Sequence, residues 1–108
     1  MSFRRRAPLN DLVQRQLDLF AHDEADLLQE AAAAEAAWNR VGRDEAEEAY
    51  GDYQLVVDAI ADRLLDIRET YARTLDASAT AAYVATFNRA ATKRFRRYTT
   101  LLSDLDDA

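Results

Sequence analysis

The sequence predicts an all-α protein built from long helices, and two features of its 108 residues support this class. The first is composition, because 22 residues are Ala whereas Gly occurs twice and Pro once. Ala has the highest helix propensity and Gly and Pro the lowest, so this balance favours helix along the whole chain. The second is that apolar residues recur at alternating steps of three and four, the repeat of helices that pack along a seam.

The seams divide the chain into three helices joined by short links, which require neighbouring helices to be antiparallel. We therefore predict a single domain over residues 1–108, folded as an up-down-up three-helix bundle with coiled-coil-like seams. Each helix of roughly 30 residues would be about 45 Å long at ~1.5 Å per residue. A long helical hairpin that completes its core by dimerising is the alternative architecture.

The first helix is predicted over residues 8–41. Pro8 suits a first helical turn, where its missing N–H needs no partner, and Asn10 is the competing N-cap. Gly42 would end the helix by adopting the left-handed conformation. Glu24 is the one polar residue on the seam. The seam positions are Val13, Leu17, Phe20, Glu24, Leu27, Ala31, Ala34, Trp38 and Val41.

The second helix is predicted over residues 44–75, with Asp44 and Glu47 forming a capping box at its start. Gly51 lies off the seam, and the apolar phase continues across it, so we predict one unbroken helix. The seam positions are Ala46, Tyr50, Tyr53, Val57, Ile60, Leu64, Ile67 and Tyr71.

The third helix is predicted over residues 78–105, with Asp76 and Ser78 as alternative N-caps. Outside the three helices, residues 1–7 form a basic arm and residues 106–108 a frayed tail. The seam positions are Val84, Phe87, Ala91, Phe95, Tyr98, Leu102 and Leu105.

Composition also limits the functional class. The chain has no Cys, which excludes disulfides and thiolate metal sites. Its 49% hydrophobic content is too high for a disordered chain, and the net charge is -6. Polar residues interrupt the N-terminal region, so we expect neither a signal peptide nor a membrane-spanning segment, and we predict a cytoplasmic protein.

Glu24 is the most informative residue, because a carboxylate on an apolar seam is costly unless it is paired. In the predicted antiparallel register, position 24 lies level with about residue 93 on the third helix. We therefore predict a buried ion pair between Glu24 and Arg94 that fixes the register of the bundle.

The alternative interpretation is a polar site inside the bundle that binds Mg²⁺ or Mn²⁺ through acidic residues of the first two helices. Its candidate ligands are Asp23, Glu24, Asp26, Asp58 and Asp62.

Two acidic segments are faintly similar to the motifs of the all-α nucleoside-triphosphate pyrophosphohydrolases. That family holds magnesium with Glu-Glu-x-x-Glu on one helix and Glu-x-x-Asp on a later one, and the similar segments here are residues 22–27 and 47–52. His22 stands where the first Glu is expected, and Ala49 stands three residues before Asp52 where Glu is required. The resemblance would imply a metal-dependent nucleotide hydrolase with a degenerate site, and we assign no family from it.

A basic cluster marks the third helix, and aromatic residues lie within it. Such a pattern can follow a phosphate backbone and stack bases, so phosphate or nucleic-acid binding is a further alternative. The rings of Phe95 and Tyr98 fall on the apolar seam, and the second helix is acidic, so we favour pairing inside the protein. The cluster consists of Arg89, Lys93, Arg94, Arg96 and Arg97.

No complete catalytic group is recognisable, whereas the seams are long. The leading hypothesis is therefore a non-enzymatic helical interaction or assembly module with no cofactor, whose partner is another protein or a second copy of this chain.

Overall fold

The computed structural model describes the backbone of residues 2–99 and the side chains of residues 8–99. This part of the chain is helical and contains no strand, which confirms the predicted all-α class. None of these helices combines the length and the apolar character needed to cross a bilayer. The elements are α1 (Ser2–Asp23), α2 (Ala25–Arg40), α3 (Arg43–Ala72), α4 (Ala77–Arg94) and the short 3-10 helix η1 (Arg96–Tyr98).

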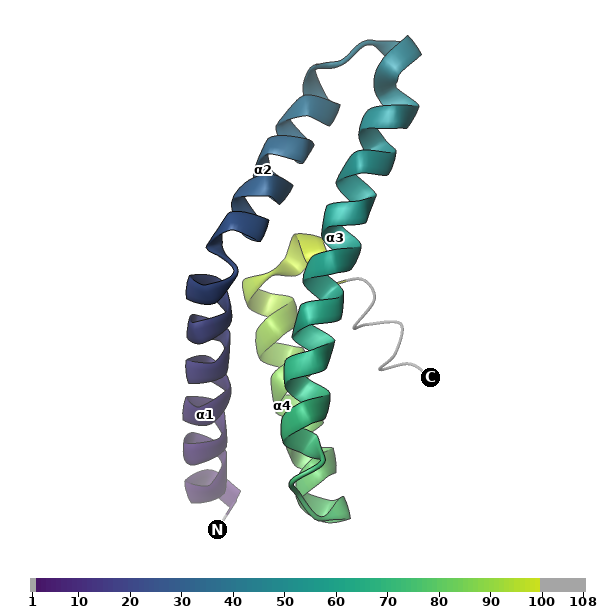
Figure 1. Cartoon of the computed structure of the whole chain (residues 1–108). Helices are drawn as coiled ribbons and strands as arrows, with labels where there is room; N and C mark the ends of the chain where they lie inside the picture. The colour runs from purple at the N-terminus through teal and green to yellow at the C-terminus, as the bar shows by residue number, and fades with distance from the viewer. Residues whose placement is uncertain (1, 100–108) are drawn as a thin grey trace.

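The four helices form an elongated body of 56 × 29 × 22 Å. Figure 1 shows α2 continuing upward from α1, α3 running back down past both, and α4 rising again beside the lower half of α3. The described chain thus has four helices where the sequence predicted three, because the first predicted helix is divided.

The division of the first predicted helix falls at Glu24, whose backbone (φ -108, ψ 29) leaves the helical region. The helical hydrogen bonds resume with the bond from the Leu28 N–H to the Glu24 carbonyl, at 3.0 Å. The start of the helix also differs from the prediction. Residues 2–7, predicted as an arm, are helical, and Pro8 lies inside α1. Proline has a φ that a helix accepts, so α1 continues through Pro8 with one backbone hydrogen bond fewer.

α3 is unbroken across Gly51, as predicted, and a Cβ added there would meet nothing within 4 Å. Its start differs from the prediction. Gly42 is extended (φ -78, ψ 177) rather than left-handed, and the helix begins at Arg43, so Asp44 lies in the first turn and is not the N-cap.

α4 begins at the first of the two predicted caps. The Asp76 carboxylate accepts a hydrogen bond from the Ala79 N–H at 2.8 Å, whereas Ser78 lies inside the helix and is exposed. The helix was predicted to continue to residue 105, but it ends at Arg94, where Phe95 leaves the helical region (φ -121, ψ 44). The predictions for residues 100–108 lie outside the described residues.

The core lies where α1, α3 and α4 meet and includes buried residues from all four helices. Tyr83 and Phe87 of α4 are fully buried at its centre. Phe20 of α1 meets Phe95 edge to face, with ring centroids 5.3 Å apart. The core cluster consists of Val13, Leu17, Phe20, Ala31, Ile60, Leu64, Ala72, Tyr83, Phe87, Ala91 and Phe95.

The early end of α4 explains the break at Glu24. Beside α4, α1 packs chiefly against that helix; beyond the end of α4, α2 packs chiefly against α3. Figure 1 shows α2 leaning toward α3 above the last turn of α4. The chain must therefore change direction at the level of the Phe20–Phe95 contact, and Glu24 is one turn above Phe20.

The upper end of the α2–α3 pair is covered by aromatic side chains rather than by a third helix. Trp38 stacks on Tyr53 with ring centroids 5.5 Å apart and contacts Tyr50 at 4.8 Å. Aromatic pairs of this kind contribute about 0.5–1.5 kcal/mol beyond the area that they bury.

The cap at Asp76 gives a direct test of where α4 begins. Asp76→Ala removes the acceptor for the Ala79 N–H and should lower the free energy of unfolding by about 1 kcal/mol. Ser78→Ala is the matched control and should change it by less than about 0.5 kcal/mol. Chemical denaturation followed by circular dichroism measures both variants, and a larger loss in the Ser78 variant would contradict the assignment.

Candidate functional site

The acidic residues predicted as metal ligands do not form a site. Within residues 8–99, no group of three or more His, Asp or Glu side chains is placed to hold a metal ion. Asp23, Asp26, Asp58 and Asp62 are exposed, and only Glu24 is partly buried. The spacing put these residues at similar heights along the bundle but could not show that their side chains do not converge on one site.

The predicted Glu24–Arg94 pair is replaced by two other pairs. Glu24 lies 3.6 Å from Arg63 of α3, and Arg94 bonds Asp18 of α1 at 2.6 Å. The Phe20–Phe95 contact sets the register, so Arg94, next to Phe95, faces Asp18 rather than Glu24. The Glu24 side chain is 27% exposed and that of Arg63 61%, so their pair is not a buried one.

Two of the five residues in the basic cluster at the end of α4 pair with acids inside the molecule. Arg94 bonds Asp18, and Arg97 bonds Glu35 at 2.6 Å. The aromatic ring between them, Phe95, is buried against Phe20 and cannot stack on a base. Arg89, Lys93 and Arg96 are exposed on this segment. Within the described residues, pairing inside the protein thus accounts for Arg94 and Arg97 but not for the other three basic residues.

An extended concave feature lies between α1 and α3. Both helices pack on α4 but approach each other little, which leaves an open groove, here called the α1–α3 groove. It joins three hollows of about 500, 460 and 280 Å³. The first and second share Tyr71, and the second and third share Gln16 and Ile67, so the three are continuous.

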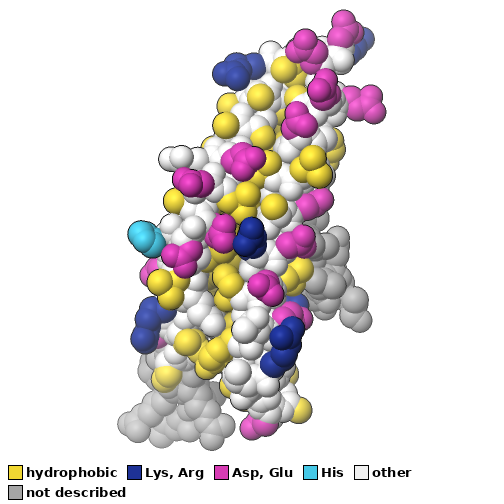
Figure 2. Space-filling view, viewed as in Figure 1, with side chains coloured by type: hydrophobic (Ala, Val, Ile, Leu, Met, Phe, Trp, Pro, Cys, Tyr) yellow, Lys and Arg dark blue, Asp and Glu magenta, His cyan; other side chains and the backbone are white. Residues whose placement is uncertain are grey.

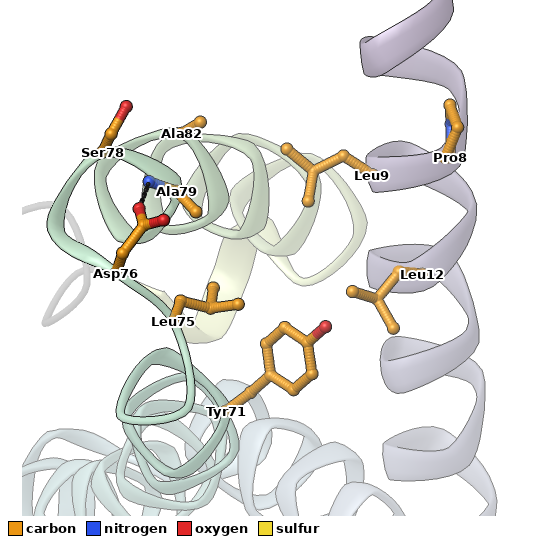
Figure 3. A pocket seen from close by; sticks show the side chains of 9 residues that line it. All are labelled: Pro8, Leu9, Leu12, Tyr71, Leu75, Asp76, Ser78, Ala79 and Ala82. Carbon is orange, nitrogen blue, oxygen red and sulfur yellow. Dashed lines mark hydrogen bonds between the residues drawn. The ribbon is translucent and has the colours of Figure 1, made fainter.

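Apolar side chains line both ends of the groove, and Ile67 and Tyr71 continue the apolar lining through a middle part that also contains Gln16, Asp66, Thr70 and Thr74. Figure 3 shows the end near the α3–α4 turn, where Leu9 and Leu12 of α1 point toward Tyr71 and Leu75. Leu19, farther along α1, is 61% exposed. The apolar groove residues are Leu9, Leu12, Leu19, Phe20, Ile67, Tyr71 and Leu75.

This groove explains where the predicted α3 seam departs from the real core. The prediction placed Leu64, Ile67 and Tyr71 on the buried side, but the buried row runs Leu64, Arg68, Ala72. Ile67 and Tyr71 are only partly buried because they face the groove. The apolar stripe that the sequence shows on α3 is therefore wider than the row of α3 residues that is buried in the described chain.

Tyr83 forms part of the wall between the groove and the core. Its ring is fully buried and contacts Tyr71 at 4.8 Å, and its hydroxyl donates a hydrogen bond to the Gln16 Oε1 at 2.8 Å. Burial raises the pKa of Tyr83 to about 12, so the hydroxyl remains protonated at neutral pH. This contact links α4 to the α1 side of the groove.

Arg68 is a buried charge that the sequence interpretation missed. It is 6% exposed, and its Nη1 donates to the Asn88 Oδ1 at 2.7 Å while its Nη2 reaches Glu69 at 3.2 Å. Its position four residues after Leu64 and four before Ala72 was the available signal. Asn88 is itself buried, so the pair links α3 to α4 across their interface.

Comparisons of the chain with protein-family models, with curated proteins and with solved structures found no match.

The Arg68–Asn88 contact should matter for stability. Asn88→Ala removes the acceptor from a buried guanidinium and should lower the free energy of unfolding by about 1.5–3 kcal/mol, the range for hydrogen bonds to charged groups. A double-mutant cycle with Arg68→Met isolates the contact, and the two losses should not add. Asn39→Ala, at an exposed position, is the control. Additive losses in urea denaturation would show that the contact contributes little.

The raised pKa of Tyr83 predicts a loss of stability at high pH. The unfolded phenol ionises near 10 and the folded one near about 12, so the native state retains the proton longer. The stabilising contribution is complete below pH 10 and is lost as the pH rises toward 12. Tyr83→Phe should flatten this part of the stability curve, as measured by urea denaturation across that pH range. Curves of equal slope for the two proteins would refute the assignment.

Proposed function

We propose that the chain is a non-enzymatic helical interaction or assembly module of the cytoplasm, and that the α1–α3 groove is its contact surface. In this proposal the molecule is an up-down-up bundle, with α1 and α2 as one bent arm and a seam-like row of apolar residues along each helix. Its partner is another protein or a second copy of the chain.

The observation that carries the proposal is the apolar surface left uncovered between α1 and α3. Three connected hollows form the groove. Leu19 projects from α1 with 61% of its surface exposed. Single exposed apolar residues are common, but contiguous apolar patches with a polar rim are typical of interaction sites. A groove between two helices is also a recurrent place for binding a third.

Figure 2 shows the same face as a surface, with apolar side chains along its middle, acidic side chains on both sides and a few basic side chains among them. An apolar centre inside a charged rim is the usual anatomy of a protein interface. The sequence pattern supports the same function, because the α3 seam contains more apolar residues than the described chain buries.

Site-specific photocrosslinking in cells tests the proposal. A crosslinking amino acid at Leu19, inside the groove, should give one discrete adduct with a partner protein or with a second copy. The same group at Leu55 is the matched control, because Leu55 is 70% exposed on α3 but lies outside the groove. Light scattering across a range of concentrations then separates a dimer from a complex with another protein. A monomer at every concentration, with no adduct at position 19, would rule the proposal out.

A further inference from the structure

The charge around the α1–α3 groove narrows the class of partner, if the groove is the contact surface proposed above. Every ionisable side chain that lines the three hollows, Tyr71 apart, is an acid, and none is Lys, Arg or His. These acids are Asp23, Glu24, Asp66 and Asp76. They are spread along the groove, with Asp76 at one end, Asp66 in the middle and Asp23 with Glu24 at the other.

Two of the four acids already have a partner. Glu24 lies 3.6 Å from Arg63, and Asp76 accepts the capping bond from Ala79. Within residues 8–99, no hydrogen bond or ion pair involves the side chain of Asp23 or Asp66. Both are exposed and available to a cation from outside.

The size and shape of the groove fit a helix. Its α1 wall extends from Leu9 to Asp23, which at ~1.5 Å per residue is about 21 Å, or about four helical turns. The apolar wall residues Leu9, Leu12 and Leu19 of α1, with Gln16 between, follow steps of three and four, the spacing that receives the apolar stripe of a partner helix.

Neither a second copy nor residues 100–108 of this chain supplies cations along a free apolar stripe. A second copy has the same acidic groove and a net charge of -6, so two such faces repel. The basic residues Arg94 and Arg97 of a second copy are already bonded to acids of that copy. Its Arg89, Lys93 and Arg96 are exposed, but the apolar row beside them, which includes Phe87 and Phe95, is buried in the core of that copy. These cations therefore flank no free apolar stripe. Residues 100–108 contain three Asp and no basic residue.

We propose that the α1–α3 groove binds an amphipathic helix of another protein, about 14 residues long, whose apolar stripe is flanked by Lys and Arg. The apolar stripe contacts Leu9, Leu12, Leu19 and Tyr71, and the flanking cations pair with Asp23 and Asp66. Electrostatic complementarity at such a rim selects the partner and speeds the encounter more than it adds affinity.

Selection from a displayed peptide library tests this inference. The library consists of 15-residue helices with Leu fixed at steps of three and four and with Lys, Gln or Glu allowed at the flanking positions. Selection on the whole protein should enrich Lys over Glu at these positions by about fivefold to tenfold, as expected for two exposed ion pairs. Enrichment should vanish with Asp23→Asn and Asp66→Asn combined and should persist with Asp58→Asn, an exposed acid outside the groove.

The outcomes separate the two proposals. Helices enriched without preference between Lys and Glu would overturn the cationic partner but leave the groove as a helix-binding site. Affinity that is equal for a selected peptide and for its scrambled sequence would show charge attraction alone and would also overturn the inference. Failure to enrich any helix, together with no crosslink at Leu19, would remove both proposals. A dimer that dissociates in the Leu19→Ser variant would assign the groove to a second copy instead.

Discussion

The architecture depends on the place where α4 stops. As far as Arg94, this helix lies against both α1 and α3 and keeps them apart, and the buried rings of Tyr83 and Phe87 fill the space between the three. At Phe95 the helix ends, and the edge-to-face contact with Phe20 closes the core. Below this level two helices are separated by a third, and above it α2 packs directly against α3. The open groove and the bend at Glu24 are two consequences of the same short helix.

The helical class and the continuity of α3 were accessible from the sequence, because both follow from local chemistry. The Ala content favours helix, and Gly51 falls on an open face where an added Cβ would meet nothing. The break in the first predicted helix and the early end of the third could not be predicted from the sequence. Glu24 and Phe95 are ordinary helix residues, and neither Gly nor Pro occurs between residues 77 and 99 to mark an end. Tertiary packing fixes both positions, and propensity is too weak to oppose it.

The ion pair of the candidate site was predicted between the wrong residues for the same reason. Matching Glu24 with Arg94 required a straight first helix in the antiparallel register that the short links predict. With the bend, Glu24 meets Arg63, and Arg94 meets Asp18. The sequence did contain a signal for the groove, because Ile67, Tyr71 and Leu75 form a separate apolar stripe on α3. It could not show that the stripe faces open space, since that depends on how far α1 and α3 stand apart.

The pair formed by α2 and the first part of α3 extends beyond the end of α4, and no side chain from residue 32 to residue 52 is buried. The free energy that keeps this segment folded comes from partly covered Ala, Trp and Tyr contacts rather than from a closed core. Such segments open locally at a lower free energy than the rest of a domain, and their amide hydrogens exchange sooner. The molecule therefore consists of a well-packed lower half, which contains the core, and a less stable upper segment formed by α2 and the first part of α3. The upper segment can open locally while the lower half stays folded.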